Sequence, residues 1–377
     1  MQSVKYPALI SLVFLAIAAM LVVLAGPPKL SFANRVNVSC ANTTADAATI
    51  NTAITGSSAG DEIVIDGPCL LNATIKLLGD RSYRGESRTG TILLQANSSN
   101  LTAMFASDSY ENNSAFVGQP LSVRSLTLDG NKANNTGTTV GIMIRSWQTV
   151  IEDVDITDMD GDGIRITEVS ANGTHLSNTL GNGVINNSFI EYSGGHGISV
   201  VDSENAATDW MVTHNFIAYS GVDAIHSDNV AGWQISDNHI YGVQQNAIYA
   251  HRMYNTTIAN NSIDDIGETT TVGTWYGIYG TVQGGKSSTV VGNRIFTDGI
   301  NASSTYRYLA LYKVNYGDGK ASVTGNVIRG ANTSLETGLY YAKGGGTSLT
   351  VSSTGNNVAD VGTQRFIGTG VTVDTGL

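Results

Sequence analysis

The sequence WMVTHNFIAYSGVDAIHSDNVAG (residues 210–232) is followed by WQISDNHIYGVQQNAIYAHRMYN (233–255) and TTIANNSI (256–263), so one 23-residue unit is written almost three times. Asn215, Asn238 and Asn261 occupy the same place in each copy. Ile225 and Ile248 each follow their asparagine by ten residues. A repeat of this length predicts a solenoid, because no copy can bury its apolar face alone and each must pack on its neighbours.

The composition favours short strands and turns. Glycine accounts for 43 of the 377 residues, charged residues make up only 14%, and Asn, Ser, Thr, Val and Ile are abundant. Such a composition is typical of turn-rich, strand-rich proteins. The net charge is −11 with only 20 Lys and Arg residues, whereas a nucleic-acid groove needs clustered cations. We therefore expect no nucleic-acid partner.

The repeat extends in both directions with variable length. Asn187 precedes the three copies, and Asn293, Asn326 and Asn356 follow them. Stacked asparagine side chains satisfy one another's amide groups where a coil turns, so we interpret the series as a structural ladder. Each coil also has a strand centre, at Ile164 (with Asp153 as its ladder residue), Ile198, Ile225, Ile248, Ile278, Leu311, Leu339 and Phe366.

Some coils carry extra residues. Insertions follow the strand centres at 168–182 and 202–209 and precede them at 265–275 and 296–307. The coils through Asn215 and Asn238 are the shortest. Insertions in a solenoid become loops on one face, so we expect the short coils to form the floor of an elongated cleft.

The N-terminus carries an apolar segment that runs without interruption from Ala8 to Ala25. Its length is at the lower edge of a membrane span, and its small C-terminal residues suit a signal peptidase. We predict that residues 1–27 are a signal peptide or a membrane anchor and that residues 28–377 form one β-helix domain. This domain would be secreted or at the cell surface, with a membrane contact only through an uncleaved N-terminal segment.

Two further patterns fit an extracytoplasmic protein. Cys40 and Cys69 are predicted to form a disulfide, with two buried free thiols as the alternative. Asn-x-Ser/Thr triplets predict N-glycosylation, unless the Asn ladders generate them as a by-product. The triplets begin at Asn37, Asn42, Asn72, Asn97, Asn100, Asn112, Asn134, Asn172, Asn186, Asn255, Asn260, Asn301 and Asn332.

The region before the repeats suggests how the solenoid begins. Residues 46–54 place Ala48, Ile50 and Ile54 on one helical face, which predicts a helix in a cap of about residues 36–60. The segments GDEIVI (60–65), ATIKL (73–77) and SYRG (82–85) follow. Together they resemble the opening of the right-handed parallel β-helix (pectin-lyase-like) superfamily. The resemblance implies an all-β fold, a single-stranded right-handed parallel β-helix with an N-terminal helical cap.

Parallel strands repeat at about 4.8 Å, so equivalent positions in successive coils form rows. Three such rows are rich in acids, histidines and tyrosines, the residue types that catalysis uses. Two positions before the strand centre stand Asp162, His196, Asp223 and Asn246; one after stand Arg165, Ser199, His226, Tyr249 and Tyr279; three after stand Asp228 and His251, with Arg252 alongside.

Asp162, His196, Asp223 and His226 are the candidate catalytic residues. Asp162 and Asp223 lie two coils apart, about 9.6 Å, which suits the acid and base of an inverting glycoside hydrolase. The alternative is that these residues occupy tight turns and bond only local backbone amides. The segments Asp160–Ile164 and Gly195–Ser199 resemble the polygalacturonase family; Asp162 matches its second aspartate and His196 its histidine.

The resemblance to polygalacturonases is partial. Val140 stands where that family has an aspartate, and residues 225–228 replace its Arg-Ile-Lys, so the substrate stays open. A lyase or epimerase is the other catalytic hypothesis, with His or Tyr abstracting a proton beside a uronate held by Arg. The candidate substrate-binding residues are Arg165, Asp228, Tyr249, His251, Arg252 and Tyr279.

Asp158, Asp160 and Asp162 alternate before Gly163, which is how a calcium loop begins. The twelfth position is Val169 instead of Glu, although Glu168 is adjacent. The segment is therefore interpreted either as a calcium site or as a plain Asp/Gly turn, and no other cofactor is expected.

Three functional hypotheses remain, because a fold does not choose among them. The first is an extracellular, carbohydrate-active enzyme, an inverting glycoside hydrolase acting on a polysaccharide. The second is a non-catalytic glycan-binding or cell-surface structural glycoprotein, and the third is a polysaccharide lyase or epimerase. In each of them the partner is a polysaccharide or a surface glycan.

Overall fold

The computed structural model describes residues 34–313, 317–345 and 348–375. The predicted signal peptide or anchor, residues 1–27, lies outside the described residues. Among the residues that are described, no helix combines the length and the apolar character needed to cross a membrane. The body from Arg35 onward forms one compact unit.

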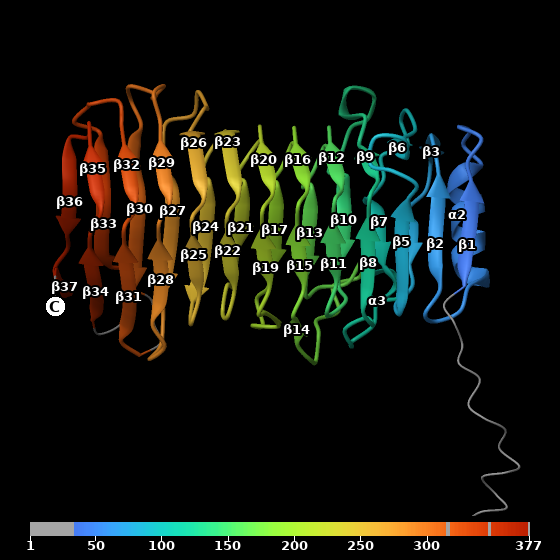
Figure 1. The fold of residues 1–377 in the computed structure, drawn as a ribbon, viewed down its shortest axis with the longest axis horizontal. Helices are drawn as coiled ribbons and strands as arrows, with labels where there is room; N and C mark the ends of the chain where they lie inside the picture. Colours follow the sequence, from blue (N-terminus) through green and yellow to red (C-terminus); the bar gives the residue numbers. More distant parts are fainter. Residues whose placement is uncertain (1–33, 314–316, 346–347, 376–377) are drawn as a thin grey trace, which may run out of the picture. The chain divides into compact units, whose positions relative to one another are not determined.

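Three long parallel sheets build this body, and successive coils lie side by side in sequence order (Figure 1). Sheet A contains β1 (Arg35–Ser39), β2 (Glu62–Asp66), β5 (Arg81–Gly85), β8 (Leu121–Arg124), β11 (Val150–Glu152), β15 (Val184–Asn186), β19 (Met211–Thr213), β22 (Gln234–Ser236), β25 (Thr257–Ala259), β28 (Ser288–Val291), β31 (Gly319–Thr324), β34 (Leu349–Thr354) and β37 (Val371–Asp374).

The other two sheets follow the same order. Sheet B contains β3 (Cys69–Leu71), β6 (Ile92–Gln95), β9 (Thr127–Asp129), β12 (Asp155–Thr157), β16 (Phe189–Glu191), β20 (Phe216–Ala218), β23 (His239–Val243), β26 (Ser262–Ile266), β29 (Arg294–Phe296), β32 (Val327–Arg329) and β35 (Asn357–Ala359). Sheet C contains β4 (Ile75–Leu77), β7 (Ala103–Ser107), β10 (Val140–Ile144), β13 (Ile164–Thr167), β17 (Ile198–Val201), β21 (Ile225–Ser227), β24 (Ile248–Met253), β27 (Thr274–Val282), β30 (Thr305–Lys313), β33 (Glu336–Lys343) and β36 (Thr363–Ile367).

The 23-residue repeat is one full coil with a strand in each sheet. The unit that begins at Trp210 supplies β19, β20 and β21, and the unit that begins at Trp233 supplies β22, β23 and β24. Inward side chains of equivalent strands pair in register, as Ile225 does with Ile248, and both are fully buried. Burial of each such aliphatic side chain contributes about 1.5–3 kcal/mol to the stability of the fold, so packing between neighbouring coils stabilises them. The predicted right-handed parallel β-helix is confirmed.

The asparagine ladder is confirmed from Asn215 to Asn356. Each Nδ2 donates to the Oδ1 of the next asparagine at 2.9–3.0 Å, through Asn238, Asn261, Asn293 and Asn326. Asn187 and Asp153, however, do not belong to it. Both are in the left-handed region, with φ of 48° and 53°, and Ser188 holds the ladder position, where its N–H donates to Asn215 Oδ1. The longer spacing before Asn215 displaces the asparagine by one residue.

The strand centres are confirmed as far as Ile278 and shift beyond it. Ile278 pairs with Leu309, so the predicted centre Leu311 lies two residues too late and faces Gly280 instead. Leu339 is a strand centre as predicted, although it pairs with Leu309 and not with Leu311. Its partner in the last coil is Arg365, one residue before the predicted centre Phe366. The cause is that β27 and β30 take up part of the predicted insertions, residues 274–275 and 305–307, as additional strand.

Helix α2 (Asp46–Gly56) lies within the predicted cap and buries Ile50 and Ile54, while the same range also holds strand β1. The Asp46 carboxylate accepts the N–H groups of Ala41, Thr43 and Leu70. Burial opposes the charged form, but these hydrogen bonds lower the pKa of Asp46. The predicted disulfide joins Cys40 to Cys69 beside this helix.

The remaining elements belong to loops. They are α3 (Asp108–Glu111), the 3₁₀ turn η1 (Lys132–Asn134), and the short pair β14 (Leu180–Gly181) and β18 (Ala207–Thr208), which links the two insertions that follow sheet C strands. Arg145 connects several segments of this region through hydrogen bonds, although no sequence pattern identified it. It is fully buried, and its guanidinium donates to the backbone carbonyls of Ser109, Ser114, Glu168 and Thr174.

Candidate functional site

The predicted rows exist on sheet C. Ile164, Ile198, Ile225 and Ile248 pair in register, so the residues two positions before them align, as do those one position after. We call the first set the turn row (Asp162, His196, Asp223, Asn246) and the second the outer row (Arg165, Ser199, His226, Tyr249, Tyr279). The outer-row side chains point away from the aliphatic core, because neighbours along a strand face opposite sides of the sheet.

The turn row is itself a hydrogen-bonded ladder. Asp162 Oδ1 accepts the N–H of His196, His196 Nδ1 accepts the N–H of Asp223, and Asp223 Oδ1 accepts the N–H and the Nδ2 of Asn246. Asn246 Oδ1 continues the series to the N–H of Tyr276. The turn row thus has the backbone-bonding role that the sequence offered as an alternative to catalysis. Its carboxylates keep a second oxygen for other contacts.

The second oxygen of Asp162 is already engaged. Asp162 Oδ2 lies 2.6 Å from Arg165 Nη2 and 2.8 Å from Arg165 Nε, and it accepts Ser199 Oγ at 2.5 Å. Ser199 is a partner that the sequence rows contained but that was not expected to act. Protonating Asp162 would break this ion pair, so the carboxylate is an unsuitable general acid.

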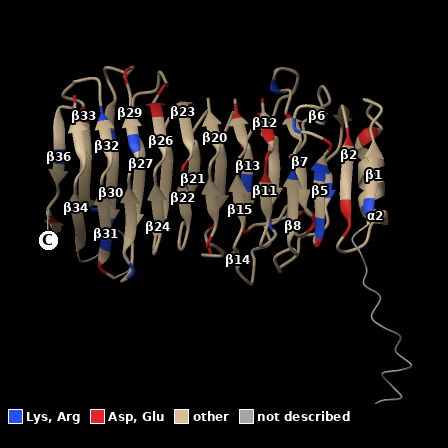
Figure 2. Cartoon of the chain, viewed as in Figure 1, with Lys and Arg blue, Asp and Glu red and all other residues tan. Residues whose placement is uncertain are grey.

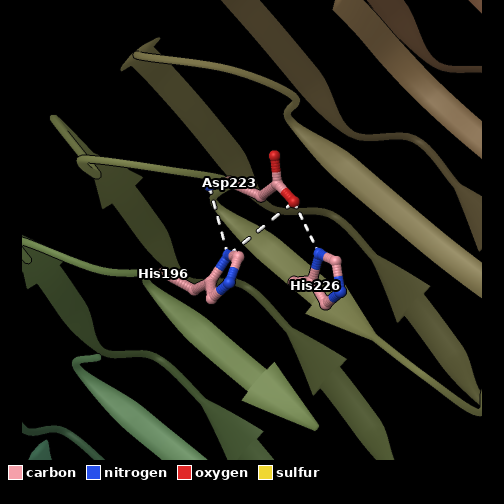
Figure 3. A group of neighbouring side chains, drawn as sticks. All are labelled: His196, Asp223 and His226. Carbon is pink, nitrogen blue, oxygen red and sulfur yellow. Dashed lines mark hydrogen bonds and ion pairs between the residues drawn. The ribbon is translucent and has the colours of Figure 1, made fainter. Parts of the chain in front are cut away.

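Asp223 instead faces two imidazoles, as Figure 3 shows. Its Oδ2 lies 2.6 Å from His226 Nδ1 and 3.7 Å from His196 Nδ1. Asp223 is 2% exposed, whereas the side chains of His196 and His226 are 22% and 30% exposed. The carboxylate is therefore held inside, and the rings reach the surface.

The pKa values of the two histidines are shifted in opposite directions. Burial lowers the pKa of His196 despite the nearby charges of Asp162 and Asp223. Burial also opposes the charged form of His226, but the hydrogen bond to Asp223 and the charges of Asp223 and Asp228 prevail and raise the pKa of His226. Since Nδ1 of His226 bonds Asp223, Nε2 is the nitrogen left to exchange a proton with a ligand.

The outer row continues as a stack of rings. The His226 and Tyr249 rings are 4.8 Å apart and nearly parallel, and the Tyr249 and Tyr279 rings are 4.3 Å apart. Burial raises the pKa of both tyrosines, which keeps their hydroxyls protonated. Stacked rings cover one another's faces, so a ligand here would meet ring edges and hydroxyl groups.

The third predicted row is only partly gathered at this site. Asp228 accepts the N–H of Asp202, and burial lowers the pKa of His251, whose Nε2 is buried without a hydrogen-bond partner among the described residues. The pairing of β24 with β27 shifts register between Ala250 and Met253. Arg252, within that shift, reaches Asn205 in the 202–209 insertion and not the outer row.

Near Arg252 the surface is hollowed. A cavity of about 310 Å³ is lined by Asn205, Tyr254, Gln283 and Gly284. None of the row residues, His226 included, is among its lining residues.

Calcium at Asp158, Asp160 and Asp162 remains a prediction, but the three side chains have different surroundings. Asp158 lies 3.8 Å from Lys132 Nζ, and Asp162 pairs with Arg165. Burial raises the pKa of Asp160, whose Oδ2 has no partner among the described residues. Where the structure describes the chain, the three side chains that meet as potential metal ligands are His196, Asp223 and His226.

The cationic residues are dispersed along the body. In the view of Figure 2, the Lys and Arg residues are scattered along the body and are not gathered into a groove.

Comparison with known proteins supports the fold. No family model matches the sequence, and no curated protein matches it. Among solved structures, the chain is similar to the A-modules of the mannuronan C-5 epimerases AlgE4 and AlgE6 of Azotobacter vinelandii, with 17% and 16% identity and TM-scores of 0.57 and 0.59. These matches cover 88% and 89% of this chain and 96% of each module.

A second kind of enzyme shares the fold. The family 28 exopolygalacturonase of Yersinia enterocolitica matches with 11% identity over 92% of this chain and 78% of its own, with a TM-score of 0.50. At these identities the likeness establishes the fold, a parallel β-helix, and leaves the reaction to be inferred from the side chains.

Proposed function

We propose that this pectin-lyase-like β-helix protein removes the C5 proton of a uronate unit in a polysaccharide, as a lyase or a C-5 epimerase does. The observation that carries the proposal is the Asp223–His226 pair, joined at 2.6 Å, with the His226 ring at the surface of the shortest coils. Among the hypotheses that the sequence left open, this pair favours proton abstraction over hydrolysis.

His226 is the base in this proposal. In the neutral ring Nδ1–H donates to Asp223, which leaves a lone pair on Nε2. Nε2 takes the C5 proton, whose acidity derives from the adjacent carboxylate of the sugar. The resulting imidazolium is stabilised by Asp223, which has the orienting role of a carboxylate behind a catalytic histidine.

Two outer-row neighbours complete the proposed reaction. The protonated hydroxyl of Tyr249, one coil from His226, returns a proton either to the leaving glycosidic oxygen or to C5. Arg165, two coils away on the other side, contacts the sugar carboxylate with the part of its guanidinium that Asp162 leaves free. The planar N–H groups of a guanidinium match the geometry of a carboxylate.

Inverting hydrolysis is the weaker alternative because it needs one protonated carboxyl and one free carboxylate. Asp162 is paired with Arg165 and Ser199, and Asp223 is bound to His226 and Asn246. The similar A-modules belong to mannuronan C-5 epimerases, whose reaction takes place at the same carbon. This supports a uronate polymer as the first substrate to test.

The test is a panel of mannuronan, polygalacturonate and a neutral glucan incubated in deuterated buffer with a chelator. We expect deuterium at C5 of a uronate or an unsaturated product absorbing in the ultraviolet, and loss of either signal in His226→Gln. His239→Gln is the matched control, since His239 lies 3.0 Å from Asp264 on sheet B. New reducing ends without unsaturation would instead identify a hydrolase, and retention on immobilised glycan without any product would identify a binding protein.

We further propose that the protein is exported and glycosylated. The Cys40–Cys69 disulfide fits an oxidising compartment. All the predicted acceptor asparagines are exposed except Asn186 and Asn301, which are half-buried. Treating the natively produced protein with an N-glycan amidase should lower its mass; an unchanged mass would show that the triplets are a by-product of the Asn-rich turns.

A further inference from the structure

Three potential metal ligands converge at the centre of the turn and outer rows. The ligand atoms of His196, Asp223 and His226 all lie within 4.8 Å of one another (Figure 3). They come from two adjacent coils, and the parallel pairing of β17 with β21 fixes their relative positions. A small adjustment of the side chains would bring all three atoms to coordination distance of one ion.

The arrangement is preorganised and open on one side. Asn246 binds Asp223 Oδ1 through its backbone N–H and its Nδ2, which orients the carboxylate with Oδ2 toward both imidazoles. Such outer contacts orient metal ligands in proteins. The partly exposed rings leave room for water or another exogenous ligand, as three-ligand metal sites do.

The donor set selects the kind of ion. Two imidazole nitrogens and one carboxylate oxygen suit zinc, cobalt or copper, whereas calcium and magnesium prefer oxygen ligands in larger number. The charges of Asp162 and Asp228 act on these histidines and favour a cation, while Arg165 opposes it.

We propose that His196, Asp223 and His226 bind one divalent transition-metal ion of the zinc class, through Nδ1, Oδ2 and Nδ1. Binding moves the His226 proton from Nδ1 to Nε2 and replaces both the His226–Asp223 hydrogen bond and the contact of the Asp223 N–H with His196. No net proton is gained or lost. The occupied site and the proton-transferring pair of the proposed function are therefore alternative states of the same side chains.

The test uses tag-free, chelator-stripped full chain and no substrate, so that it does not depend on the proposed reaction. Co²⁺ is titrated and followed by its visible absorption, and Zn²⁺ binding is measured by calorimetry. We expect one ion per chain with Co²⁺ bands typical of nitrogen and oxygen ligands. His226→Gln and His196→Gln should each weaken binding by about 100-fold or more, beyond the 10–100-fold that loss of an outer-shell partner produces.

His239→Gln, which alters a His–Asp pair on sheet B, should bind as the wild type does. Near-ultraviolet circular dichroism verifies that each variant is folded. Absence of Co²⁺ bands and of Zn²⁺ heat in the wild type, or unchanged binding in a folded His226→Gln protein, would overturn the proposal. Catalytic results on metal-free protein would be unaffected by either outcome.

Discussion

At the scale of single residues, Asp223 organises the candidate site, because its two carboxylate oxygens bind different partners. Oδ1 binds the amide of the next coil through Asn246, and Oδ2 binds His226. A buried carboxylate whose two oxygens both accept hydrogen bonds is held in one orientation. The geometry of the proposed base is thus set by a residue that the fold also requires.

The first prediction concerns pH. The pKa of His226 is raised above its ordinary value of 6.5 by Asp223, and the base must be unprotonated to accept a proton. We therefore expect kcat/KM of the chelator-treated enzyme to rise with pH through a midpoint above 6.5. In Asp223→Asn the residual activity should show that midpoint at lower pH, because the charge is gone. A midpoint that does not move would assign the titration to another group.

The second prediction concerns the asparagine ladder. Asn238→Ala removes the acceptor of two Asn215 groups and the donors to Val212 O and Asn261 Oδ1, all of them buried. Leaving such groups unpaired costs about 3 kcal/mol in total, to be measured as the free energy of unfolding in denaturant. Asn356→Ala, at the half-buried end of the ladder, should cost less because water can replace the lost partner. Equal losses at both positions would contradict this explanation.

The sequence predicts where the site residues stand in the coils, but not which partners their side chains contact. The spacing placed Asp223 and His226 in adjacent rows correctly, because strand register follows from the repeat. It could not show which oxygen faces which partner, nor that Arg165 would pair with Asp162. Those contacts depend on rotamers, which a repeat does not encode.

At the scale of elements, the insertions are anchored by buried polar contacts. Glu168 is fully buried, and its carboxylate accepts His175 Nδ1 and Ser203 Oγ. The guanidinium of Arg145 satisfies backbone carbonyls from α3 to the 168–175 segment, although burial lowers the pKa of Arg145. These contacts explain how a loop without its own apolar core keeps a defined position beside sheet C.

The third prediction follows from Arg145. Arg145→Met removes the guanidinium hydrogen bonds to four carbonyls. The carbonyls of Ser109, Glu168 and Thr174 keep a backbone N–H donor, so the loss of four charge-assisted bonds should cost about 3 kcal/mol of unfolding free energy. Amide exchange should quicken in the 108–118 and 168–176 segments first. Arg329→Met is the matched control. The Arg329 side chain is 67% exposed and forms a surface ion pair with Asp360, so its loss should change stability by less than about 0.5 kcal/mol. Similar losses of unfolding free energy in both variants would contradict this connecting role of Arg145.

The sequence predicted elements well where coils are short and less well where they lengthen. From Ile164 to Ile278 each strand centre is where the periodicity places it. After that point β27 and β30 are nine residues long, and an apolar alternation that continues past its expected end offers several equivalent centres. Leu309 and Leu311 could not be told apart, because both face the core and are fully buried.

At the scale of the whole described body, stability is distributed coil by coil. Each complete coil contributes one strand to each of the three sheets and contacts the coils beside it. Stability in such a structure is approximately a sum over repeats and their interfaces. A complete repeat is therefore the unit that can be deleted while the packing between the remaining coils is kept.

The fourth prediction removes one such unit. Deleting residues 233–255 would place Val212 against Ile258, Ile217 against Ile263 and Ile225 against Ile278, with every inward row preserved. We expect a soluble protein with the same far-ultraviolet circular dichroism per residue and one cooperative thermal transition. Deleting only residues 233–243 should abolish folding, because the remaining part of the coil is out of register. A folded partial deletion or an unfolded complete one would refute the coil boundaries.

The hydrogen bonds of the turn row affect how the sequence of such a protein can evolve. Asn246 and Asp223 hold the backbone of the next coil in the same way, through one side-chain oxygen. They differ in a single atom, since the amide has a nitrogen where the acid has its second oxygen. A coil can therefore gain or lose a reactive group in one substitution while its scaffold contact is kept, so the chemistry of this surface can drift far more freely than its architecture.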